Sequence, residues 1–187
     1  VAECGIGRCL SYVGIDLTAA MLAAGEAEQL HAPAEGWQHL EQALQLWDVV
    51  DDAERRAGID IVKLGLRAAA MASRAGENSR AASLADAAAA RLDPRADPRR
   101  ADAVHHKRAL HLLSDDRPEQ ALGAARQALK LAAEASDTPT PPSAWAAATA
   151  ARALVSLDRP NEAREYGQRA RADAVEIASA GAEAEAR

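Results

Sequence analysis

The chain has 187 residues and a formal net charge of −6, with 49% hydrophobic residues but only 3% aromatic residues and no Phe. About fifty residues are alanine, the best helix former, whereas the residues that favour strands are scarce. This composition predicts an all-α protein. The acidic balance argues against general nucleic-acid binding, and no apolar run is long enough to span a bilayer.

Alternating apolar stretches and helix breakers predict eight helices paired into four hairpins. In chain order, we expect hairpins near residues 17–50, 60–92, 99–135 and 143–177. Within them, we place the helices near 17–30, 34–50, 60–75, 79–92, 99–113, 118–135, 143–157 and 161–177. The joins between hairpins are rich in Pro and Asp.

The two ends of the chain are interpreted as cut edges of a longer array. Residues before 17 resemble the end of a preceding helix, and residues 182–187 resemble the start of a truncated fifth hairpin. The first residue is not Met, so we expect the chain to be a segment of a larger polypeptide.

Cys4 and Cys9, five residues apart, point to different sides of a helix. This spacing argues against a disulfide and favours a reducing, cytoplasmic location.

A repeated turn motif supports the pairing into hairpins. Residues 114–121 (SDDRPEQA) resemble residues 156–163 (SLDRPNEA), at an offset of 42 residues. Asp is suited to capping a helix, and Pro fits the first helical turn, where its missing N–H is not needed. An earlier copy runs over residues 75–81, where Gly76 is suited to ending a helix in the left-handed conformation.

Small residues recur at corresponding positions after each turn. Gly36, Ala81, Ala121 and Ala163 lie 45, 40 and 42 residues apart. In each copy, the residues four and seven positions later are again mostly small: Leu40 and Ala43, Ala85 and Ala88, Ala125 and Ala128, and Gly167 and Ala170. Steps of four and three keep these residues on one helical face, so we expect the paired helices to approach each other closely.

These positions resemble the tetratricopeptide pattern, although the period is longer and the Trp and Tyr signature positions are mostly Ala. The segment 32–47 (APAEGWQHLEQALQLW) also resembles a recurrent segment of large ATP-binding LuxR-type transcriptional regulators, at the start of their tetratricopeptide-like region. The resemblance implies one domain over 1–187, folded as a right-handed α-α superhelix of about four hairpins. It also implies an ATPase module upstream and a helix-turn-helix downstream, neither of which lies in this chain.

No motif for catalysis, cofactor binding or metal binding is found in the sequence. There is no Gly-Lys pair for a phosphate loop, and Gly5 and Gly7 lack the third Gly of a dinucleotide loop. His105, His106 and His111 have poor spacing for shared metal ligation. We therefore expect no enzyme activity in this chain, with ATP bound only by the missing upstream module.

The candidate binding residues follow from the resemblance, because the first helix of each tetratricopeptide-like hairpin lines the concave surface. This placement implies a mainly basic set of binding residues, suited to an acidic peptide or an anionic effector: Lys63, Arg74, His106, Trp145 and Arg152. The alternative is that the cations are simply solvated and that Trp145 fills a gap between repeats. Trp37 and Trp47 are expected to pack in the core with Leu40 and Leu44.

Two functions fit these expectations. The first is a non-catalytic regulatory scaffold within a LuxR-type regulator, which binds a protein partner or small effector and transmits the signal between the ATPase and DNA-binding modules. The second is a free-standing tetratricopeptide-like adaptor. In either case we expect no direct nucleic-acid or membrane binding by this segment, and a homo-oligomer is compatible with both.

Overall fold

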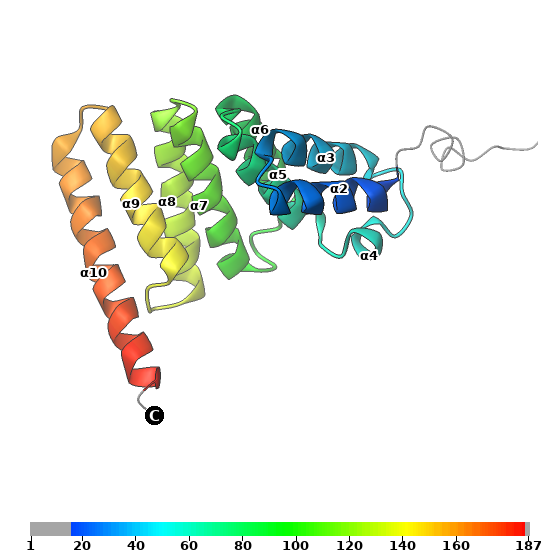
Figure 1. Ribbon diagram of the computed structural model, residues 1–187. Helices are drawn as coiled ribbons and strands as arrows, with labels where there is room; N and C mark the ends of the chain where they lie inside the picture. The colour runs from blue at the N-terminus through cyan, green and yellow to red at the C-terminus, as the bar shows by residue number, and fades with distance from the viewer. Residues whose placement is uncertain (1–15, 186–187) are drawn as a thin grey trace, which may run out of the picture. The chain divides into compact units, whose positions relative to one another are not determined.

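The structure is a computed structural model that describes residues 16–185, with side chains described to residue 180. The expectations about Cys4, Cys9, Gly5, Gly7 and the residues before 16 lie outside this range. The described residues form nine helices and no strand (Figure 1). They are α2 (Leu17–Gln29), α3 (Pro33–Leu46), α4 (Ala53–Ala57), α5 (Ile61–Arg74), α6 (Asn78–Ala90), α7 (Pro98–Ser114), α8 (Pro118–Ala135), α9 (Pro141–Ser156) and α10 (Pro160–Glu185).

The all-α prediction is confirmed, and the expected helices are found within a few residues of their predicted bounds, with two differences. The short helix α4 forms in the join after the first hairpin, between Asp52 and Gly58, which both have left-handed backbone conformations. The last helix does not end near 177. It continues to Glu185, through the residues in which we expected a fifth hairpin to begin, because the strong helix formers Ala and Glu dominate this stretch.

The chain divides into two compact units that meet between Arg91 and Leu92. Unit 1 contains the α2/α3 and α5/α6 hairpins together with α4, and unit 2 contains the α7/α8 and α9/α10 hairpins. Each unit buries its own apolar side chains between its two hairpins. The expectation of a single repeat domain over 1–187 stays a prediction. Trp37 and Trp47 are partly buried against the core of unit 1, which agrees with their predicted packing role.

All four hairpins turn through the same backbone geometry. The first helix ends, one residue adopts a positive φ, and the second helix starts two residues later. The positive-φ residues are His31, Gly76, Asp116 and Asp158, with φ of 54°, 84°, 55° and 54°. In each turn, the amide after this residue donates to a carbonyl five positions earlier, as Arg117 N does to Leu112 O at 3.0 Å and Arg159 N to Leu154 O at 2.9 Å. This bond satisfies carbonyls that the helix end leaves free.

The predicted small residues lie five positions after each left-handed residue, and all four are buried. Ala81 and Ala121 are 0% exposed, Ala163 is 7% exposed, and Gly36 is also buried. A Cβ atom added to Gly36 would overlap Met71 Cε and would lie 3.5 Å from Ala27 Cβ. The small side chains therefore allow the second helix of each hairpin to lie close to its neighbours, as the sequence predicted.

Ion pairs join the two hairpins of unit 1 in one direction, from acids on the first hairpin to arginines on the second. Glu28 on α2 accepts two hydrogen bonds from Arg67 on α5, at 2.6 and 2.9 Å. Glu41 pairs with Arg80, and Asp48 pairs with Arg91 through bonds of 3.0 and 2.8 Å. Residues 1–60 contain 11 acidic and 3 basic residues, and arginines of the next hairpin thus partly compensate this acidic excess.

The shared turn geometry predicts opposite effects for two glycine substitutions. Gly76→Ala places a Cβ on a residue with φ of 84° and should lower the free energy of unfolding by about 1 kcal/mol. Gly123 lies exposed within α8, with no atom within 4 Å of an added Cβ. Gly123→Ala should therefore raise the free energy of unfolding by about 0.5–1 kcal/mol.

Urea unfolding followed by circular dichroism measures both changes. Destabilisation of similar size in both variants would show that the left-handed turn is not the reason for the glycine at position 76.

Candidate binding surface on α7 and α9

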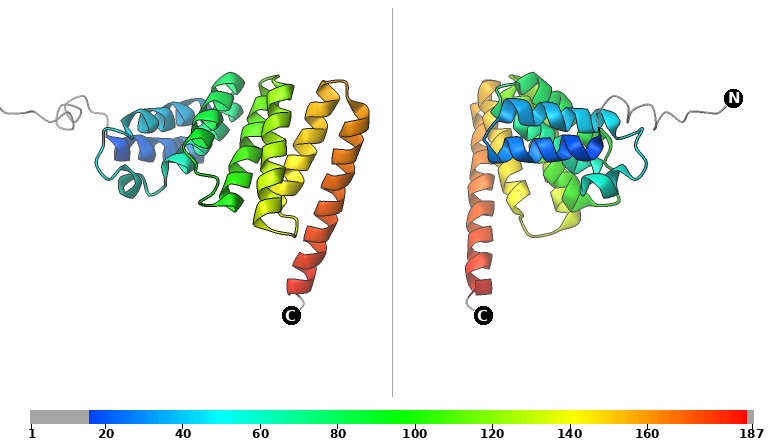
Figure 2. Two further views of the ribbon diagram at one scale, coloured as in Figure 1. Left: turned by 180° about the vertical axis from the view of Figure 1, so that it is seen from behind. Right: turned by 45° about the vertical axis from the view of Figure 1, so that its right-hand side comes forward.

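The predicted binding residues are divided between the two units. Lys63 and Arg74 lie on α5 of unit 1, and both side chains are exposed. His106 lies on α7 of unit 2, while Trp145 and Arg152 lie on α9 of the same unit. Because α7 and α9 are the first helices of consecutive hairpins and contact each other, these three residues share one part of the molecule (Figures 1 and 2).

An aromatic pair lies at the junction of α7 and α9. The rings of His106 and Trp145 have centroids 5.8 Å apart and planes inclined by 35°. Trp145 remains 58% exposed, and His106 is half-buried. Burial, with a smaller contribution from the neighbouring Lys107, lowers the pKa of His106, so its imidazole is neutral at pH 7. Trp145 is therefore anchored at one edge, while most of its surface stays open to a partner.

Arg152 and Val155 continue this surface along α9. Arg152 lies seven residues after Trp145, which places the two side chains on the same side of the helix, and both are exposed. Val155 is 67% exposed, although nothing in its sequence position had marked it as a candidate. We call these residues, His106, Trp145, Arg152 and Val155, the α7–α9 surface.

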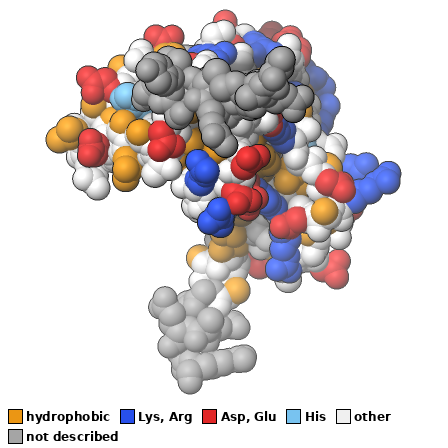
Figure 3. Space-filling model, turned by 90° about the vertical axis from the view of Figure 1, so that its right-hand side faces the viewer, with side chains coloured by type: hydrophobic (Ala, Val, Ile, Leu, Met, Phe, Trp, Pro, Cys, Tyr) orange, Lys and Arg blue, Asp and Glu red, His pale blue; other side chains and the backbone are white. Residues whose placement is uncertain are grey.

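The charge of α7 and α9 is strongly one-sided. Their sequences contain five basic residues (Arg99, Arg100, Lys107, Arg108 and Arg152) and one acidic residue, Asp102. Asp102 is only 2% exposed, so it contributes little to the outer face. On the face shown in Figure 3, by contrast, acidic and basic side chains are interspersed. The excess of basic residues predicted for the first helices is thus found on α7 and α9 of unit 2 and also on α5 of unit 1, which contains Lys63, Arg67 and Arg74 and no acidic residue.

Asp102 lies beneath this surface, where α7 meets the start of α9. Its Oδ2 accepts a hydrogen bond from Thr140 Oγ1 at 3.3 Å, while its Oδ1 is buried with no hydrogen-bond partner among the described residues. Thr140 also caps α9 by accepting a bond from the amide of Ser143 at 3.3 Å. Burial raises the pKa of Asp102 to about 6, and the Thr140 hydrogen bond opposes this shift only partly. Sequence reasoning missed this residue, because burial of one carboxylate has no pattern of its own.

The other two histidines of α7 do not form a metal site. His105 and His111 each have a buried Nδ1 that finds no hydrogen-bond partner within residues 16–185, and burial lowers the pKa of both side chains. Among the described residues, no three His, Cys, Asp or Glu side chains are arranged to hold a metal ion. His105 is half-buried and His111 is buried, so both rings lie largely within the helical packing.

On unit 1, an ion pair separates the two predicted cations of α5. Arg67 lies between Lys63 and Arg74 in sequence and is half-buried, because Glu28 holds its guanidinium. Arg74 Nη1 lies 3.7 Å from Met71 Sδ. The carboxylate of Glu28 is thus already paired with Arg67. In contrast to the α7–α9 surface, the described part of the chain brings no exposed aromatic side chain to these two cations.

A hollow of about 230 Å³ lies elsewhere in unit 2, between the end of α8, the loop that follows it and α10. Its charged lining is mixed, since Asp137, Asp173 and Glu176 oppose Arg169. Arg169 Nε is 3.8 Å from Asp173 Oδ2, so this lining cation already has an acidic neighbour. The lining of the hollow therefore has an excess of acidic residues, opposite in sign to the charge of the α7–α9 surface.

The relationship of the chain to known proteins is one of fold. No protein-family model matches it, and no curated protein matches its sequence. Among solved structures, a single-substitution variant of a candidate kinesin light chain from Podosopora anserina, with nearly identical TPR-like repeats, is similar with a TM-score of 0.66 and 18% identity. That match covers 84% of this chain and 74% of the other. The same protein without the substitution gives a TM-score of 0.63 at 16% identity, covering 86% and 76%.

BtubC (BKLC) from P. vanneervenii is also similar, with a TM-score of 0.56, 16% identity and coverage of 84% of this chain and 71% of that one. At these identities the likeness concerns the fold alone. It confirms the expected α-α helical repeat of the tetratricopeptide-like kind. Within residues 16–185, moreover, every helix is too short or too polar to cross a bilayer.

The buried carboxyl of Asp102 generates a pH-dependent prediction. Its pKa in the folded state is above the usual 3.8, so the folded chain binds this proton more tightly than the unfolded chain. The resulting stabilisation is complete below about pH 4 and is lost as the pH rises through about 6. Asp102→Asn should therefore raise the free energy of unfolding at pH 7 by about 1–3 kcal/mol, and by much less at pH 4.

Denaturant unfolding at several pH values tests this expectation. The difference between wild type and variant isolates Asp102 from the histidines, whose lowered pKa values act in the opposite direction. A difference that does not change with pH would contradict the assignment.

Proposed function

We propose that this chain is a non-catalytic scaffold that binds a protein segment on the α7–α9 surface. The observation that carries this proposal is an exposed tryptophan, Trp145, fixed by His106 and followed by Arg152 and Val155 on a helix without any acidic residue. Trp and Arg are among the residues most often responsible for binding energy at protein interfaces.

The chemistry of this surface favours a partner segment that combines carboxylates with an apolar side chain. Trp145 and Val155 offer apolar area that gains free energy when water is excluded. Arg152 and Lys107 supply positive charge, and neither has an ion-pair partner among the described side chains. A neutral His106 leaves the charge preference to these two cations.

We further propose that the scaffold belongs to a LuxR-type transcriptional regulator of the cytoplasm. The support is the resemblance of residues 32–47 to the segment that begins the helical-repeat region of these regulators. In that setting, partner binding by unit 2 would be transmitted between an upstream ATPase module and a downstream helix-turn-helix. A complete reading frame that lacked both modules would instead favour the free-standing adaptor, with the same binding surface.

Binding of acidic peptides tests the role of the surface. The probes are fluorescent peptides rich in Asp and Glu, each with a single Leu, Ile or Phe. Trp145→Ala and Arg152→Glu should each weaken binding by about tenfold or more, because each removes a central contact of about 1.4 kcal/mol or larger. Fluorescence anisotropy with the whole chain gives the dissociation constants.

Lys130→Glu is the matched control, because Lys130 is an exposed cation on the second helix α8. It should change binding by much less than Arg152→Glu. Equal losses in the two charge-reversed variants, or full binding by Trp145→Ala, would argue against the α7–α9 surface.

A further inference from the structure

The second helix of a hairpin uses one face to receive the first helix of the next hairpin. In α3, which packs against α5, this face consists of residues at steps of three, four and three: Trp37, Leu40, Leu44 and Trp47. In α8, which packs against α9, the corresponding residues are Leu122, Ala125, Leu129 and Ala132, all of them buried. We call these four positions the onward face of a second helix.

The onward face of α10 has a different chemistry. The offset of 42 residues that relates the two turns of unit 2 places Arg164, Gly167, Arg171 and Ala174 at these positions. Both leucines of α8 are thus replaced by arginines, and all four residues of α10 are exposed. The side of α10 next to this face packs on α9, with Tyr166 and Ala170 against a hydrophobic core cluster of unit 2 (Figure 2).

The backbone of this face is accessible to a close neighbour. An added Cβ at Gly167 would have no atom within 4 Å, and Ala174 carries only a methyl group. Val175, beside Ala174, is 61% exposed and offers an apolar contact. The face therefore keeps the small residues that allow two helices to approach, although its two large side chains have become cationic.

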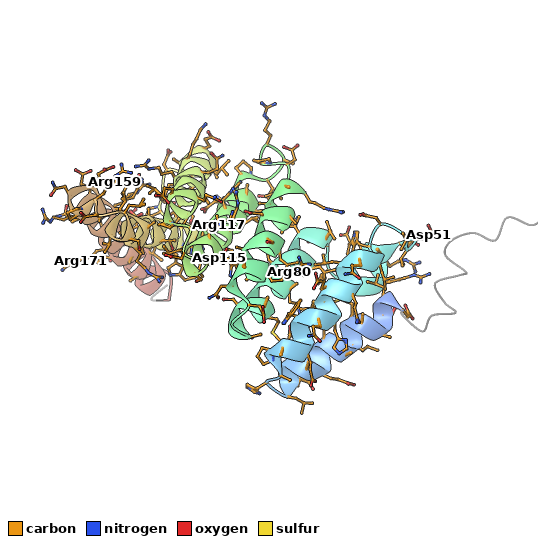
Figure 4. The ribbon with its side chains drawn as sticks, turned by 90° about the horizontal axis from the view of Figure 1, so that it is seen from above. Asp51, Arg80, Asp115, Arg117, Arg159 and Arg171 are labelled. Carbon is orange, nitrogen blue, oxygen red and sulfur yellow. The ribbon has the colours of Figure 1, made fainter. Side chains whose placement is uncertain are left out.

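Arg164 and Arg171 differ from the other arginines near α10 in their surroundings. Arg159 binds Glu162 through two bonds of 2.7 Å, Arg169 lies 3.8 Å from Asp173, and Arg126 of α8 donates to Tyr166 Oη at 3.2 Å. By contrast, Arg164 and Arg171 have no hydrogen bond or ion pair among the described side chains. Figure 4 shows Arg171 extending away from the rest of unit 2.

From this combination we infer that the onward face of α10 binds an acidic helix of a partner protein, with carboxylates two turns apart opposite Arg164 and Arg171. The position is one at which earlier second helices receive a helix, and the two cations require opposite charge in place of the usual apolar side chains. An apolar hairpin, like those received by α3 and α8, would bury both arginines without partners, which is costly. This surface is separate from the α7–α9 surface.

The α8–α9 pairing shows where the carboxylates should lie. Leu129 of α8 packs with Ala146 and Ala147 of α9. Because Arg171 is the counterpart of Leu129, a carboxylate at the position of Ala146 would face Arg171. The helices are antiparallel, so a second carboxylate two turns later, at the position of Ala153, would face Arg164.

The probe is a labelled peptide of residues 141–156 that carries Ala146→Glu and Ala153→Glu, stapled on its opposite side to keep it helical. Fluorescence anisotropy with the full chain should show saturable binding that weakens with added salt. Arg164→Glu combined with Arg171→Glu should weaken binding by about tenfold or more. The same double variant should prefer a peptide with Lys at positions 146 and 153.

Two controls make the experiment decisive. Lys130→Glu on α8 reverses an exposed cation of unit 2 outside both the onward face of α10 and the α7–α9 surface, and it should leave binding of the peptide unchanged. Circular dichroism should show that every variant is folded, since Arg164 and Arg171 are exposed. Arg164→Gln combined with Arg171→Gln is a milder test of peptide binding, because it removes the two charges without reversing them. Tighter binding of the unsubstituted 141–156 peptide, no binding of the acidic peptide, or equal binding to wild type and the double variant would overturn the inference.

Discussion

The structure depends on one constraint, the close approach of the helices of each hairpin around a small residue five positions after a left-handed turn. The turn fixes where the second helix starts, and the small residue determines how near that helix lies to its neighbours. His31, Gly76, Asp116 and Asp158 provide the turns, and the buried residues that follow are Gly36, Ala81, Ala121 and Ala163. An Ala-rich chain buries little apolar area per residue, so it relies on this proximity for its dispersion contacts.

Much of this architecture could be predicted, because turn chemistry and small-residue spacing are local features of the sequence. The features that were missed depend on tertiary surroundings or on weak local signals. Helix α4 lies between two left-handed residues, and only one of them, Gly58, is a glycine. The extension of α10 to Glu185 follows from the strong helix propensity of its Ala and Glu residues, which outweighs the single glycine at position 181, whereas the repeat pattern alone suggested a new hairpin. The division after Arg91 reflects which hairpins share a core, and that depends on tertiary contacts.

The candidate site shows the same limit. Counting along the first helices placed His106 and Trp145 on one surface, and the structure brings their rings into contact. Counting along the sequence could not show that Arg67 forms an ion pair with Glu28, since a pair between residues 39 positions apart leaves no periodic signal. Nor could it identify Asp102, whose importance comes from burial. The second helices show a further limit. The turn and the spacing of the small residues are the same in each hairpin, but the onward face of α10 carries arginines where that of α8 carries leucines.

The most direct test of the central constraint is the unfolding free energy of a chain in which Ala121 is enlarged. Ala121 is 0% exposed, whereas Ala133, on the same helix α8, is exposed. If small residues set the helix separation, Ala121→Leu should lower the free energy of unfolding in urea by about 1–3 kcal/mol, and Ala133→Leu should change it by less than about 0.5 kcal/mol. Equal stability of the two variants would contradict the account.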